Sequence, residues 1–148
     1  NDTWGLKAMK EEIDVLPITH RLAELDWGKG HFAIVAGKIT EKNVRDLFEY
    51  TYSKKGQVLD REEVYKPDLA AWLNITLEDD TDSIYVSLDR FIYPRIRDVI
   101  FNADNQPDDI YMVKGNKNQG FRKVYAKTIV NVSLQRREEM EEMNGKIS

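Results

Sequence analysis

The chain has no cysteine among its 148 residues, and it has only two histidines. Without cysteine it can form no disulfide, no thiolate nucleophile and no cysteine-ligated zinc or iron–sulfur site. No apolar run reaches the roughly 18 to 20 residues that span a bilayer, and no charged-then-apolar leader begins the chain. We expect a cytoplasmic protein without cofactor, metal or membrane partner. Because residue 1 is Asn, we expect a fragment of a larger protein.

The net charge of −4 argues against a protein that coats nucleic acid by bulk electrostatics, because that class is basic. The charge is unevenly distributed, however. The segment 114–127 carries five Lys or Arg residues and no acid, whereas four acids fall within residues 78–82. The sequence therefore predicts one basic edge and one acidic edge. No serine or carboxylate stands in a catalytic relation to either histidine, so we expect no enzyme activity in this domain.

Short apolar segments predict five strands. A nearly continuous run at Phe32–Ile39 predicts the first, with a bend at Gly37, and WLNITLE and SIYVSL alternate as a second and third. A short helix at 91–101 precedes a fourth strand at 110–114, a turn at 115–120 and a last strand at 121–132. Five strands with a helix between the third and fourth describe an all-β OB-fold, a Greek-key barrel whose exposed face binds oligonucleotides.

Helices flank this barrel in the predicted organisation. Residues 3–25 have helical spacing interrupted by Pro17, which predicts two short helices or one broken helix. We assign 1–30 to a helical lead-in and hinge, 31–133 to the OB-fold, and 134–148 to a C-terminal helix and tail. Residues 43–71 form a long insertion between the first two strands, and their alternating aromatics favour a hairpin. The charged C-terminal helix either packs on its own barrel or binds a partner.

Four sequence segments resemble the OB-fold nucleic-acid-binding domain of the tRNA-anticodon type: AIVAGKIT, LNITLEDDTDSIYVSL, DIYMVKGNKN and KVYAKTIVNV. They are most similar to the version in bacterial and phage DNA polymerase III alpha subunits, over residues 31–133. Asp82 stands where that family usually has Gly, so we expect a positive φ there. The resemblance implies a replication protein, nucleoid-associated in a bacterium or in the host cytoplasm if phage-encoded.

The resemblance also implies single-stranded nucleic acid held across the second and third strands and between two loops. Bases stack on aromatic rings and basic side chains follow the phosphates. Stacking is expected from Trp72, Tyr85 and Tyr125; hydrogen bonding from Asn74, Thr76 and Ser87; and phosphate contacts from Lys38, Lys114, Lys117, Arg122, Lys123 and Lys127. From the insertion, Tyr50, Tyr52, Lys54 and Lys55 are expected to reach the strand.

Each of these signals has a structural alternative. Trp72 and Tyr85 are buried instead if the lead-in or the insertion covers their face. The basic hairpin otherwise serves solubility and discourages edge pairing. The acids at 78–82 suit a metal ion, but a tight turn explains them without one.

Three functions remain open on the sequence. The first is a non-catalytic module for single-stranded DNA within a polymerase III alpha-like replicative polymerase. The second is a protein-interaction barrel in a replication or repair complex, whose partners include other replication subunits. The third is an anticodon-binding domain of a tRNA synthetase, which binds RNA.

Overall fold

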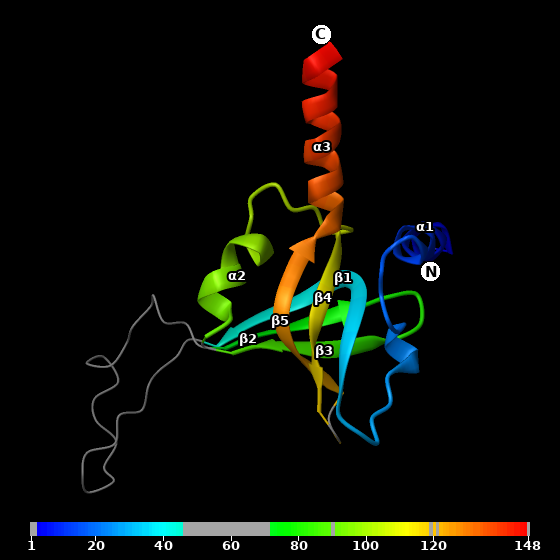
Figure 1. The fold of residues 1–148 in the computed structure, drawn as a ribbon, viewed down its shortest axis with the longest axis vertical. Helices are drawn as coiled ribbons and strands as arrows, with labels where there is room; N and C mark the ends of the chain where they lie inside the picture. Colours follow the sequence, from blue (N-terminus) through cyan, green and yellow to red (C-terminus); the bar gives the residue numbers. More distant parts are fainter. Residues whose placement is uncertain (1–2, 46–71, 90, 119, 121, 148) are drawn as a thin grey trace, which may run out of the picture.

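The structure, a computed structural model, describes residues 3–45, 72–89, 91–118, 120 and 122–147. Five strands close into a barrel in the order β1-β2-β3-β5-β4, shown in Figure 1. The strands are β1 (His31–Arg45), β2 (Trp72–Glu78), β3 (Ser83–Leu88), β4 (Ile110–Lys117) and β5 (Lys123–Asn131). All pairs are antiparallel except β3 with β5. This order, with a helix between β3 and β4, confirms the predicted OB-fold.

The long strand β1 closes the barrel because its two halves pair with two different strands. Its first half pairs with β4, its second half pairs with β2, and Lys38 has a partner on each. A register shift between Ile39 and Glu41 marks the bend between the halves. The prediction that this strand ends at Ile39 is therefore wrong, because pairing with β2 extends it to Arg45.

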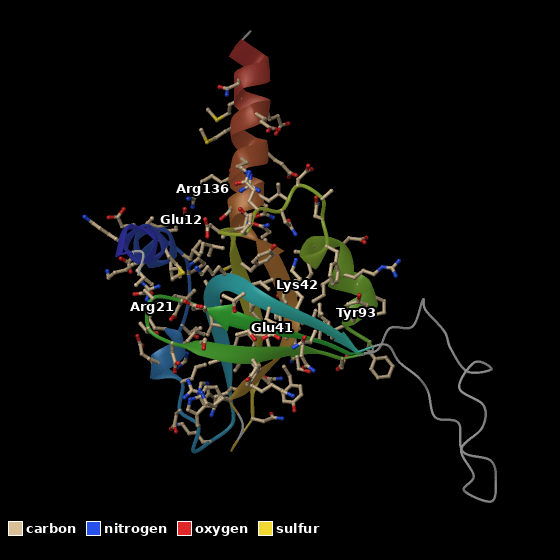
Figure 2. The ribbon with its side chains drawn as sticks, turned by 180° about the vertical axis from the view of Figure 1, so that it is seen from behind. Glu12, Arg21, Glu41, Lys42, Tyr93 and Arg136 are labelled. Atoms are coloured by element: carbon tan, nitrogen blue, oxygen red, sulfur yellow. The ribbon has the colours of Figure 1, made fainter. Side chains whose placement is uncertain are left out.

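The barrel interior is filled by alternate residues of every strand, as the period of two requires. Most of the members that are almost fully buried are aliphatic, and they include Val35, Leu73, Ile75, Leu77, Val86, Leu88, Val113 and Val124. Helix α2 (Tyr93–Ile100) covers one end and adds Tyr93 and Ile100 to this core. Pro94 lies in its first turn, where the missing N–H costs no helical hydrogen bond. On β1, Lys42 donates to the carbonyl of Ile100 at 3.1 Å, and Figure 2 shows it at this end.

The lead-in packs against the barrel. Helix α1 (Thr3–Asp14) ends three residues before Pro17, and a 3-10 helix, η1 (Leu22–Glu24), follows, so the predicted break is confirmed. Met9 and Ile13 of α1 pack with Ala36 and Ile110. Leu22 is fully buried in the main core.

Helix α3 (Val132–Ile147) continues directly from β5 and projects away from the barrel (Figure 1). Asn131 is its N-cap, because the side-chain oxygen accepts the N–H of Leu134 at 2.9 Å. The helix therefore starts two residues before the predicted Leu134. None of the described helices is long and apolar enough to cross a membrane.

Candidate nucleic-acid interface

Two rows of outward-facing residues run across neighbouring strands and form a single surface. The first row aligns Glu41, Thr76, Tyr85 and Lys123 from β1, β2, β3 and β5. The second aligns Asn43, Asn74, Ser87 and Tyr125 from the same strands. We call these eight residues the strand face.

Tyr85 is the most prominent aromatic side chain described on the strand face. It is 55% exposed, so the described lead-in does not bury it. It borders a depression of about 320 Å³ that Thr76, Ser83 and Arg122 also line. The expectation of an exposed aromatic at this position is therefore confirmed, and the hollow beside the ring offers room for a planar group.

Arg122 is held at the rim of this depression by two contacts. Its guanidinium forms an ion pair with Asp82 and donates to the carbonyl of Ser83 at 3.3 Å. Its own carbonyl accepts the N–H of Tyr85 at 3.0 Å. One carboxylate therefore offsets part of the positive charge beside Tyr85, although the Arg122 side chain remains 54% exposed.

Ser87 is 1% exposed, so the expectation that it faces solvent is wrong. Its position on the outward row is as predicted, but a short side chain lies below its larger row neighbours, Asn74 and Tyr125. The hydroxyl of Ser87 and the side-chain oxygen of Asn74 are buried without a hydrogen-bond partner in the described part of the chain. Thr76, Asn74 and Tyr125 are partly exposed.

Lys117 does not reach the surface. It is fully buried, and its ammonium lies 5.1 Å from the ring centre of Trp27. Lys117 pairs with Val124, which pairs with Val86, so it belongs to the inward row. The predicted phosphate contact is therefore wrong. The sequence placed this lysine in a turn, where strand alternation does not apply, whereas β4 continues through Lys117.

Replacing Lys117 by Met is expected to raise the free energy of unfolding by about 1 kcal/mol, because burying an unpartnered ammonium is costly. The loss of the cation–π contact with Trp27 offsets part of this gain. Urea titration followed by tryptophan fluorescence measures the change. A destabilised variant would show that the ammonium is favourable where it lies. Oligonucleotide affinity should not change, since Lys117 is not on the strand face.

The other predicted basic residues divide between two walls of the barrel. Lys123 lies beside Tyr85, and its ammonium is 5.8 Å from the ring centre of Tyr125. Lys114 and Lys127 are exposed where β4 and β5 pair, and β4 borders neither β2 nor β3. Lys38 pairs with Glu78 at the acidic end of β2. Lys123 and Arg122 are thus the two cations that the structure brings to Tyr85 from the predicted set.

Five predicted contacts fall outside what the structure describes. Tyr50, Tyr52, Lys54 and Lys55 lie in the segment 46–71, which is outside the described residues. Trp72 begins β2 opposite Arg45, but its side chain is likewise outside the description. These contacts stay predictions.

The acidic turn between β2 and β3 is organised by one buried carboxylate. Asp79 is 3% exposed and accepts the N–H groups of Thr81, Asp82 and, from the lead-in, Leu22. Asp82 does not have the predicted positive φ, because no described non-glycine residue has one. Hydrogen bonds to Asp79 hold the turn instead. Among the described residues, no three His, Asp or Glu side chains form a metal-binding group.

Sequence reasoning missed two kinds of residue at this surface. Glu41 and Asn43 belong to the strand face, but residues 40–43 are all polar, so no alternation indicated that β1 continues. Trp27 was also missed. The Lys117 ammonium lies 5.1 Å and the Arg122 guanidinium 5.8 Å from the centre of its ring. Its position depends on the lead-in returning to the β4–β5 hairpin, where Gly120 donates to its carbonyl. No local pattern encodes that contact.

No family model matches the sequence, and no curated protein matches it. Among solved structures, an OBody bound to hen egg-white lysozyme is similar, with 18% identity and a TM-score of 0.47. The similarity covers 78% of this chain and 94% of that chain. Because this likeness is weak, the OB-fold assignment rests on the strand order and register described above.

Proposed function

We propose that the barrel is a non-catalytic module that binds single-stranded DNA across the strand face, within a polymerase III alpha-like replicative polymerase. The observation that carries the proposal is the exposed Tyr85 ring beside a depression, with Lys123 and Arg122 next to it. The polymerase assignment rests on the sequence resemblance of residues 31–133.

The chemistry of the strand face fits a single strand better than a duplex. An exposed ring offers a base a stacking surface worth about 1–3 kcal/mol, which requires an unpaired base. Lys123 is one strand away from Tyr85, and Arg122 lines the same depression, so both can approach the phosphates that flank a stacked base. Thr76 and Asn74, both partly exposed on β2, add a hydroxyl and a side-chain NH₂ group for hydrogen bonds to base edges, whereas the side-chain oxygen of Asn74 is buried.

A fluorescence-polarisation titration with labelled oligo-dT tests the proposal, repeated at several salt concentrations. We expect binding that weakens as salt rises, because phosphate contacts release counterions. Absence of salt-sensitive binding at tens of micromolar protein would refute nucleic-acid binding and leave the protein-interaction barrel. Preference for a structured tRNA over oligo-dT would favour the anticodon-binding alternative.

Replacing Tyr85 by Ala is expected to weaken oligo-dT binding about 10-fold, because one stacking surface is lost. Tyr85→Phe keeps the ring and should retain most of the affinity. Phe101→Ala is a matched control, since Phe101 is an aromatic residue of similar exposure (47%) that lies at the end of α2. Equal losses for the Tyr85 and Phe101 variants would contradict the assignment of the strand face.

A further inference from the structure

A groove lies between α2 and α3, over the end of β5. Its volume is about 310 Å³, and Val99, Val130 and Leu134 contribute half-buried apolar side chains to it. An apolar cavity of about 150 Å³ is enough to hold benzene, so this groove has room for one leucine or phenylalanine side chain. The groove is thus an apolar recess that remains open between two helices.

The charged groups on the rim of the groove are acidic. Asp98 stands on the α2 side with a side chain 98% exposed, and Glu138 stands on the α3 side. Helical geometry places Leu134 one turn before Glu138 and Glu142 one turn after it, on the same face of α3. The rim therefore presents negative charge from both helices.

Nearby cations neutralise this rim only in part. Arg136 lies on the opposite side of α3, toward α1, as Figure 2 shows. Arg137 is bound to Asp109 by an ion pair of 2.5 Å. Arg97 forms a long, exposed ion pair with Asp98, at 3.9 Å, which offsets part of the charge of Asp98 and contributes little energy.

We propose that this groove docks a basic, apolar-centred peptide segment of a partner protein. A leucine or phenylalanine side chain fills the recess over Val130 and Leu134, and flanking lysine or arginine side chains pair with Asp98 and Glu138. The argument for this occupant is charge complementarity: the floor is apolar and the rim is acidic. A nucleic acid would be repelled by the same rim.

The groove is separate from the strand face, so the two sites can be occupied together. Lys123 begins β5 and Val130 is its next-to-last residue, which separates them by about 20–25 Å along an extended strand. The docking proposal therefore does not depend on the proposed DNA binding. A module with both sites would tether a single strand and a partner at opposite ends of one barrel.

The test is a polarisation titration of the full chain with a fluorescein-labelled peptide, Gly-Lys-Arg-Leu-Phe-Lys-Arg-Gly. A second peptide with Gly-Gly in place of Leu-Phe has the same charge and no apolar centre. We expect the first peptide to bind at least about 5-fold more tightly, because it alone buries apolar surface. Equal affinities would overturn the proposal, since they would show charge attraction without use of the recess.

Variants then locate the site. The double variant D98N/E138Q should weaken binding about 5- to 10-fold, in keeping with two exposed ion pairs. The matched control E11Q/E24Q removes two exposed carboxylates from the lead-in and should leave the affinity unchanged.

Amide chemical shifts should change at Val99, Val130 and Leu134 on peptide addition. Equal losses in both double variants, or shifts confined to the acidic turn, would overturn the assignment. Self-association through the groove, seen by sedimentation, would also overturn it.

Discussion

Replacing Asp109 by Asn is expected to lower the free energy of unfolding by about 2–3 kcal/mol at pH 7, because it removes the buried carboxylate of an ion pair whose arginine is partly exposed. Asp109 is 3% exposed and receives Arg137 at both carboxylate oxygens, at 2.5 and 2.9 Å. Asn131 and the backbone N–H of Gln106 each donate to it at 2.9 Å. The carboxylate therefore joins the start of β4, the end of β5 and helix α3.

This contribution should depend on pH. Burial alone would raise the pKa of Asp109, but hydrogen bonds from Arg137, Asn131 and Gln106 outweigh it and lower the pKa from 3.8 to about 2. A carboxyl with a lowered pKa in the folded state stabilises the protein fully above the unfolded value of 3.8. That stability, about 2 kcal/mol, is lost as the pH falls toward 2.

Urea unfolding followed by circular dichroism at pH 7 and at pH 2 measures both effects. The difference between the wild-type chain and Asp109→Asn should be large at pH 7 and should shrink at pH 2, where the Asp109 carboxyl is about half protonated in the folded state and most of its charge-dependent stability is lost. Asp108→Asn is the matched control, because Asp108 is the adjacent acid and is exposed. A pH-independent difference would mean that the carboxylate's charge is not what stabilises α3.

The order of elements could be predicted from the sequence because each strand has its own local signal. Alternation in WLNITLE and SIYVSL fixed which residues point inward, and Ile75, Leu77 and Val86 are buried as that pattern requires. The same alternation placed Thr76 and Tyr85 on the outer surface. Periodicity of two is a property of the strand itself and needs no knowledge of its partners.

The orientation of Lys117 could not be predicted, because it depends on where β4 ends. The composition of Gly115–Gly120 is typical of a turn, yet pairing with β5 keeps Lys117 in the strand. Side chains alternate between the two faces only as far as the strand continues, so an error in where the strand ends assigns the following side chains to the wrong face. The contact between Asp109 and Arg137 could likewise not be predicted from local sequence patterns, since the two residues are 28 positions apart.

Ala in place of Gly115 is expected to have the largest effect of any substitution considered, a loss of about 4 kcal/mol or more. A Cβ at this position would lie 2.2 Å from the carbonyl oxygen of Tyr125 and 2.9 Å from the Cα of Ala126. Both atoms belong to the backbone of β5, so no side-chain rotation can relieve the clash. The strands would have to separate where their register shifts between Lys114 and Gly115.

Comparing Gly115→Ala with Gly145→Ala separates the effect of the close β4–β5 approach from the general effect of adding a methyl group. Gly145 lies near the end of α3, where an added Cβ meets no atom within 4 Å. Ala there should be neutral or stabilise by up to about 1 kcal/mol, because Gly is a poor helix former. Urea titration of both variants gives the two changes. If Gly115→Ala proved as stable as the wild-type chain, β4 and β5 could not approach as closely as described. Tyr125 pairs with Ser87 of β3. The close packing of Gly115 against Tyr125 therefore also helps to position the part of the strand face that β5 contributes.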